Sequence, residues 1–164
     1  MASVKTAYVK GKIDKSVLAE FSFILYRMFY LELWRVAGLR KTPTSIIQMG
    51  NLLLSLSRVI EEIIRSGYGL AMDIKVFNYC HDKWFSKENW NSVSAYENNV
   101  VSLIDDFIKN TWALSLDGRN LVFTFKIRNA VAHRLQTEPM LSEKFGELSM
   151  AMMSSLAFVC DSFP

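Results

Sequence analysis

Cysteine and histidine are scarce in this sequence, which contains only two residues of each type among its 164. Cys80 and Cys160 lie far apart in a chain without a recognisable secretory signal, so we expect both thiols to stay reduced in a cytoplasmic protein. Cys80 and His81 are adjacent, but no second ligand pair follows at the spacing that zinc sites require. The sequence therefore predicts no disulfide and no metal site, and it contains no glycine-rich phosphate loop or other cofactor motif.

Long uninterrupted apolar runs are also missing, although apolar residues make up 51% of the chain. Charged side chains interrupt the most apolar windows, residues 21–39 and 46–64, and the run Leu148–Val159 is too short to cross a bilayer. We therefore expect a compact soluble protein without a membrane span. Charged residues amount to only 21%, so a single small domain has more apolar surface than its core needs, and we expect part of this surface to form a subunit interface.

The excess of positive charge is small, because 19 lysines and arginines face 16 aspartates and glutamates, for a formal net charge of +3. This balance is compatible with an anionic partner such as nucleic acid but does not require one. Residues 1–16 contain no apolar segment of the signal-peptide type, and their lysines are Lys5, Lys10, Lys12 and Lys15. We interpret residues 1–16 as a basic flexible arm and residues 17–164 as a single domain.

Only three prolines and seven glycines occur, and most of them fall between segments that have helical periodicity. A first helix is expected over 17–37 and should end at Gly38, and its apolar residues cover so much of its surface that it should be buried on two sides. Thr42 and Pro43 have the pattern of an N-cap and a first helical residue, which predicts a second helix that ends near residue 66. Its polar residues recur every three or four positions and predict one exposed stripe, made of Gln48, Asn51, Ser55, Arg58, Glu62 and Arg65.

The second half of the chain has weaker patterns. Segment 121–127 has a strand-like composition and could pair with 113–116 as a hairpin, but we favour a helix because no partner strand is predicted elsewhere. The sequence thus predicts an all-α fold, a compact bundle of four to five helices. The other expected elements are a short helix near 74–84, a long helix over 87–113 capped by Ser86, a turn at Asp117-Gly118 and a final helix over 141–159.

One short segment, Arg128-Asn129-Ala130-Val131-Ala132-His133, contains residues suited to RNA cleavage without a metal. Histidine suits proton transfer because its pKa lies near neutrality. Arginine suits the phosphate because its planar guanidinium binds two oxygens and stays charged. On a continuous helix, Asn129 and His133 share one face, whereas Arg128 and His133 point about 140° apart. Either the helix frays near Leu135, or two copies of the motif meet across a dimer axis.

This segment resembles the Arg-x4–6-His signature of the HEPN superfamily (higher eukaryotes and prokaryotes nucleotide-binding), whose members are all-α bundles and in many cases metal-independent endoribonucleases. A polar residue after the arginine and a position between the last two helices are typical of the signature, and both are found here. The resemblance implies that Arg128 binds the phosphate, that His133 transfers protons and that Asn129 orients or polarises. It also implies a homodimer whose two motifs face each other in a composite cleft.

The resemblance leaves two alternatives for function. The first is a metal-independent endoribonuclease that acts by 2′-hydroxyl attack as the effector of a toxin–antitoxin or antiviral defence system, with a cognate antitoxin or regulatory protein. The second is a non-catalytic helical dimer that binds a nucleotide, RNA or a partner protein through the same cleft. One toxin branch carries a tyrosine two residues after the histidine; Leu135 stands there, which argues against regulation by modification of that tyrosine.

Other charged groups admit simpler interpretations. Lys126 and Arg134 flank the motif and either add positive charge for an RNA backbone or serve only solubility. The adjacent carboxylates Glu61-Glu62 and Asp105-Asp106 diverge by about 100° on a helix, so we interpret them as solvent-facing or salt-bridging groups and not as an acid–base pair. We interpret His81 as a surface residue of an irregular segment.

Overall fold

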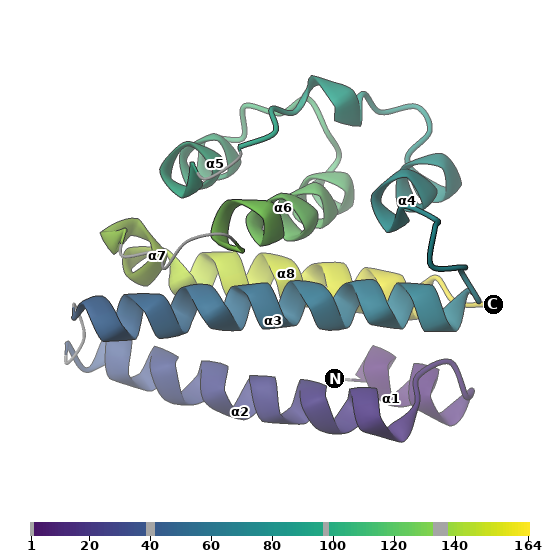
Figure 1. Ribbon diagram of the computed structural model, residues 1–164, viewed down its shortest axis with the longest axis horizontal. Helices are drawn as coiled ribbons and strands as arrows, with labels where there is room; N and C mark the ends of the chain where they lie inside the picture. The colour runs from purple at the N-terminus through teal and green to yellow at the C-terminus, as the bar shows by residue number, and fades with distance from the viewer. Residues whose placement is uncertain (1, 39–41, 97–98, 133–137) are drawn as a thin grey trace.

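The computed structural model describes residues 2–38, 42–96, 99–132 and 138–164, and over these residues the protein is all-α, as predicted (Figure 1). Eight α-helices are present there, more and shorter than the four to five expected. In chain order the elements are α1 (Ala2–Val9), α2 (Lys15–Val36), α3 (Pro43–Gly67), α4 (Val76–Trp84), the 3-10 helix η1 (Trp90–Ser92), α5 (Val100–Ile108), α6 (Leu116–Val131), α7 (Pro139–Glu143) and α8 (Phe145–Asp161).

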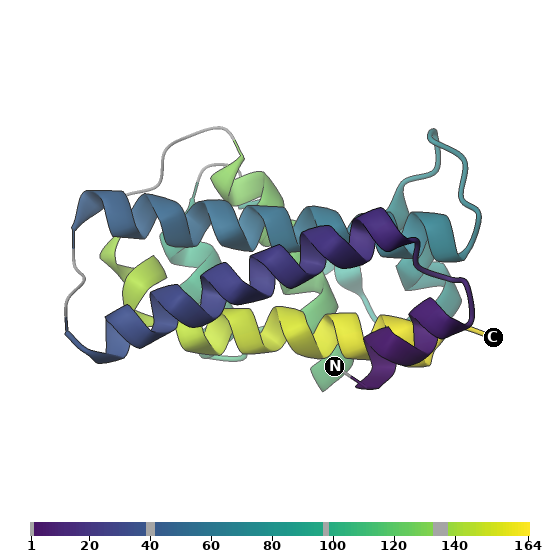
Figure 2. The same cartoon turned by 90° about the horizontal axis from the view of Figure 1, so that it is seen from below.

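The helices are arranged in three layers, with α3 and α8 side by side in the middle (Figures 1 and 2). Helices α1 and α2 cover one side of this pair, α4 and α6 cover the other, and α5 packs on α6. Helix α6 packs against α3, α5 and α8, and its residues 120–125 are all buried. None of the described helices is both long and apolar enough to span a membrane.

Helix α3 begins at its predicted cap, whereas α2 begins at Lys15, two residues before the expected start at residue 17, because Asp14 caps it. The Asp14 carboxylate accepts a hydrogen bond from the Ser16 backbone N–H at 2.7 Å, and the Thr42 hydroxyl oxygen accepts one from the Ser45 N–H. The polar stripe of α3 faces solvent or is half-buried, as expected from its periodicity. The prediction that the first helix is buried on two sides is wrong within one chain, because only one side of α2 packs against the rest of the bundle.

The long helix expected over residues 87–113 does not form, and η1 and α5 occupy only parts of it. The backbone of Tyr96 adopts a φ of 53°, and Asn110 adopts the same φ, which a right-handed helix cannot accommodate. The Tyr96 hydroxyl donates to the Asp106 carboxylate at 2.5 Å, and this contact holds the interruption in place. The side chain of Asn99 then caps the N-terminus of α5, so the chain restarts its helix there and not at Ser86.

Segment 121–127 is helical, as favoured, but Asp117 and Gly118 form the first turn of α6 and not a separate turn. The Ser115 hydroxyl caps this helix by accepting a hydrogen bond from the Gly118 N–H at 3.1 Å. Because α6 is covered on nearly all sides, its apolar residues follow no single stripe, which explains the strand-like composition. The expected final helix is divided at Lys144 into α7 and α8.

Residues 1–16 differ from the flexible arm that we expected. Ala2–Val9 form α1, which packs against α8 and buries Val4 and Ala7. Ile13, in the connection to α2, is also buried. The lysines of this segment therefore lie on α1, in the turn that follows it and at the start of α2.

Glu88 connects the loop after α4 to the start of α6. Its carboxylate accepts hydrogen bonds from the Ser115 N–H at 3.0 Å and from the Trp90 indole N–H at 2.9 Å. Burial acts to raise the pKa of Glu88, but these hydrogen bonds outweigh it and lower the pKa overall. A Cβ on Gly118 would lie only 2.2 Å from the Glu88 Oε2, so the contact depends on glycine at this position.

We expect Gly118→Ala to lower the free energy of unfolding by about 1–3 kcal/mol, because the added methyl group displaces the Glu88 carboxylate. In a Glu88→Ala background the same substitution should be neutral or stabilising by up to about 1 kcal/mol, since alanine favours a helix more than glycine does. Urea unfolding of the four proteins in this cycle measures the difference. Equal effects of Gly118→Ala in both backgrounds would show that the carboxylate contact is not what requires glycine.

Candidate functional site

The segment that resembles the HEPN signature begins in the last turn of α6. Helix α6 ends at Val131, and Ala132 is its C-cap, with its N–H donating to the Arg128 carbonyl at 2.9 Å. The predicted site residues His133 and Arg134 lie outside the described residues.

Arg128 forms an ion pair with Glu61 of α3, which is 67 residues away in the sequence. The Glu61 Oε2 contacts the Arg128 guanidinium. The Glu61 Oε1 lies 3.7 Å from the guanidinium of Arg65. Arg65 also donates hydrogen bonds to the carbonyls of Ala71 at 2.6 Å and Ile74 at 3.2 Å. The Arg128 side chain remains 39% exposed. Glu61 thus fixes the guanidinium and neutralises part of its charge, while one side stays accessible to an anion.

A cavity of about 440 Å³ lies next to this ion pair, between α3, α4, α6 and the loop before α4. Its lining contains more cations than carboxylates, namely Arg65, Lys75, Lys126 and Arg128 against Glu61 and Asp73. The remaining wall is largely apolar and includes Met72, Ile74, Val76, Phe77 and Phe125. Asn129 is exposed and also lines the cavity. Cations beside apolar and aromatic surface suit a ligand that has both a phosphate and a flat base.

Lys126 lies in the same cavity as Arg128 but is less available than a surface lysine. Its ammonium group donates to the Val93 carbonyl at 3.1 Å and lies 5.5 Å from the centroid of the Phe77 ring. Burial lowers the pKa of Lys126.

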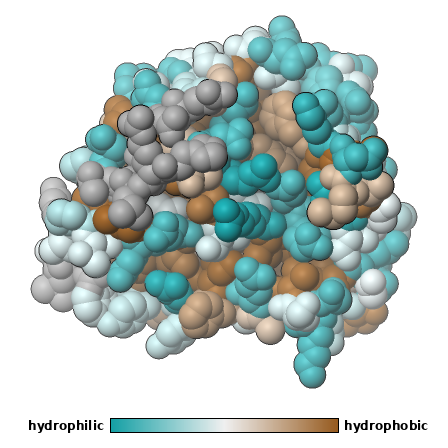
Figure 3. Space-filling view, viewed as in Figure 1, coloured by the Kyte–Doolittle hydropathy of each residue, from teal (hydrophilic) through white to brown (hydrophobic). Residues whose placement is uncertain are grey.

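In the space-filling view, polar side chains prevail over α4 and α6, above an apolar band along α2 and α3 (Figure 3).

Sequence reasoning missed Glu61 and Arg65 as members of this site. The two residues are four apart on α3 and share one face, which was the available signal. No pattern in the sequence indicated that this face meets α6. The contact between α3 and α6 depends on tertiary packing. The buried Ser57 hydroxyl of α3 donates to the Thr124 carbonyl of α6 at 2.6 Å, one turn before Glu61 and Arg128.

His81 lies in α4, which matches the short helix expected near 74–84, and its side chain is half-buried instead of lying at the surface. Its Nδ1 is 2.8 Å from the Asp82 carboxylate, and its Nε2 is 2.9 Å from the Glu88 carbonyl. The hydrogen bond to Asp82 raises the pKa of His81, because both acceptors favour the doubly protonated ring. Burial raises the pKa of the neighbouring Cys80 to about 12. The contact with the Glu88 carbonyl links α4 to the following loop, and Cys80 is buried in the core.

Comparisons with known proteins find no significant match of the chain to any family model, curated protein or solved structure. The resemblance to the HEPN superfamily consequently depends on the motif residues themselves. The described geometry brings Arg128, Asn129 and Lys126 together at one cavity and adds Glu61 and Arg65 to them.

Proposed function

We propose that this protein is a metal-independent endoribonuclease with Arg128, Asn129 and His133 at its site. The observation that supports this most is the position of Arg128, half-exposed at a cavity with further cations and aromatic surface. Phosphate contacts from arginine and lysine supply most of the affinity of proteins for nucleic acids. An RNA strand bound here would place a phosphodiester beside the Arg128 guanidinium.

The proposed reaction is a transesterification within the RNA. The 2′-oxygen forms a bond to phosphorus, the bond from phosphorus to the 5′-oxygen breaks, and the products are a 2′,3′-cyclic phosphate and a free 5′-hydroxyl. His133 accepts the 2′-hydroxyl proton, and a protonated imidazole or water returns a proton to the leaving 5′-oxygen. Arg128 stabilises the charge on the phosphorane, and Asn129 orients the phosphate. Glu61 holds the guanidinium in position before the substrate arrives.

The biological role that we propose follows the motif resemblance. The protein would act as the effector or toxin of a defence or toxin–antitoxin system, as a homodimer, with a cognate antitoxin or regulatory protein that restrains it. Growth arrest on overexpression, relieved by His133→Ala, would support this role.

A second candidate function is a non-catalytic module that binds a nucleotide, RNA or a partner protein in the same cavity. The Glu61–Arg128 ion pair favours this non-catalytic function. The Glu61 carboxylate already binds N–H groups of the guanidinium that a reacting phosphate would need. Binding of RNA without cleavage would distinguish this candidate from the first.

The decisive experiment incubates the purified protein with RNA and with DNA of the same sequence in excess EDTA. We expect cleavage of RNA alone, because DNA lacks the attacking 2′-hydroxyl. Mass spectrometry should identify 2′,3′-cyclic phosphate and 5′-hydroxyl ends. Loss of cleavage on addition of the chelator, or cleavage of DNA, would contradict the proposed mechanism.

A further inference from the structure

The outer side of α2 is apolar although it faces solvent. We call this surface the α2 outer face; its large residues are between 45% and 72% exposed and comprise Phe23, Tyr26, Phe29, Tyr30, Leu33 and Val36. The opposite side of the same helix is buried in the bundle through Phe21, Ile24, Met28 and Leu31. Figure 2 shows α2 on the outside of the molecule, in front of α3 and α8. Contiguous apolar surface of this kind marks an interaction site.

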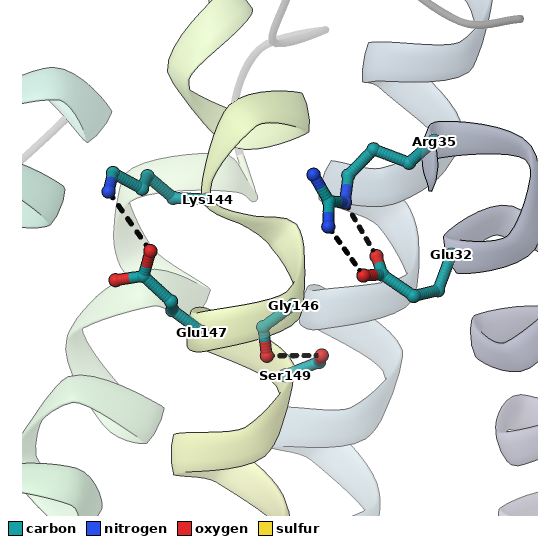
Figure 4. Close-up of polar contacts among 6 residues, drawn as sticks. All are labelled: Glu32, Arg35, Lys144, Gly146, Glu147 and Ser149. Carbon is teal, nitrogen blue, oxygen red and sulfur yellow. Dashed lines mark hydrogen bonds and ion pairs between the residues drawn. The ribbon is translucent and has the colours of Figure 1, made fainter. Parts of the chain in front are cut away.

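The α2 outer face carries little charge. From residue 19 to residue 36, the exposed charged side chains of α2 are Glu20 and Arg27, one of each sign. Glu32 and Arg35 are hydrogen-bonded to each other at 2.7 and 2.8 Å, and Glu32 lies against α8 at Gly146 (Figure 4). A surface for anionic lipid or nucleic acid would present clustered lysines and arginines, so the occupant of this face is an apolar protein surface.

The spacing on α2 matches a helix that pairs with a second helix. The exposed residues of one row are separated alternately by four and three positions, as in the core of a two-helix coiled coil, and they are Ala19, Phe23, Tyr26, Tyr30, Leu33 and Ala37. This row is symmetric about residue 28. The same row on a second copy therefore complements it whether the two helices run in the same direction or in opposite directions.

The exposed apolar area of the α2 outer face approaches what a stable interface needs. With a large side chain contributing on the order of 200 Å², the six large residues of the α2 outer face expose on the order of 600–700 Å² per chain. A stable protein–protein interface buries about 800 Å² on each partner. Exposed neighbours on α2, among them Ala19 and Arg27, add to this area.

We infer that the α2 outer face binds the same face of a second copy of this chain. This inference does not depend on the proposed function. Helix α2 lies on the opposite side of the α3–α8 layer from α4 and α6 (Figure 1), so the cavity beside Arg128 faces away from this interface. Each copy thus has a separate site, in contrast to the composite cleft that the motif resemblance implies.

Light scattering on the purified protein and on Tyr26→Glu/Tyr30→Glu tests the interface. We expect the natural chain to have twice the single-chain mass of 18.8 kDa and the variant to have 18.8 kDa. Both tyrosines are exposed in the single chain, so the circular dichroism of the variant should remain helical. Met150→Glu, on α8 and as exposed as Tyr26 at 68%, is the matched control and should leave the dimer intact.

A second variant, Tyr26→Lys/Tyr30→Lys, should also be a monomer alone. Mixed with the glutamate variant it should recover the dimer mass, because in either direction positions 26 and 30 of one copy face positions 26 and 30 of the other. A monomeric natural chain, or a dimer that survives both double substitutions, would overturn the inference. If the protein cleaves RNA, the monomeric variants should keep that activity. Loss of cleavage in the monomeric variants would contradict the inference that each copy has its own site away from the interface. The mass measurements stand even if no cleavage is found.

Discussion

Arg128→Ala should reduce the rate of RNA cleavage by a factor of about 10²–10³, which is the usual cost of removing one group that stabilises transition-state charge. His133→Ala should reduce it by about 10²–10⁴, the typical cost of losing a proton-transfer group. Arg128 is partly exposed, so its substitution should leave the helical circular dichroism signal unchanged, and the same measurement is the folding control for His133→Ala. Initial rates with excess RNA over protein measure both effects.

Two further substitutions test whether the effect of Arg128 depends on its site. Arg58→Ala removes an exposed arginine from the polar stripe of α3 and should leave the cleavage rate unchanged. Arg128→Lys keeps the charge but loses the planar guanidinium, so it should recover only part of the activity. Robust cleavage by purified His133→Ala protein would show that the motif is unrelated to the chemistry.

Leu121→Ala should lower the free energy of unfolding by about 2–5 kcal/mol, the range measured when a fully buried leucine is truncated. Leu121 is 0% exposed in α6, which three other helices contact, so the cavity that forms has little freedom to collapse. Total stabilities of single domains are about 5–15 kcal/mol, so the loss is a large fraction. Chemical denaturation monitored by circular dichroism measures the change.

Leu116→Ala is the matched control on the same helix, because Leu116 is 64% exposed. It should change the free energy of unfolding by no more than about 0.5 kcal/mol. Similar losses for the two variants would mean that the side of α6 that carries Leu121 is not packed against its neighbours.

Local sequence alone determined the starts of two helices and the all-α class. The caps at Asp14 and Thr42 satisfy backbone N–H groups that lie only two or three residues away, so they need no distant partner. The polar stripe of α3 is likewise visible in the sequence, because one side of that helix meets solvent. Asn129 and Arg128 could be selected from their chemistry, and the structure brings both to one cavity.

Tertiary structure decided the rest, because it involves partners that are distant in the chain. The positive φ of Tyr96, held by Asp106, interrupts a segment whose periodicity favours one long helix. The apolar residues of α6 form no single stripe, because other helices cover it on nearly all sides. The contact of α6 with α3 pairs Arg128 with Glu61. The apolar residues of α2 predicted burial on two sides, but only the packed bundle identified which side a single chain leaves exposed.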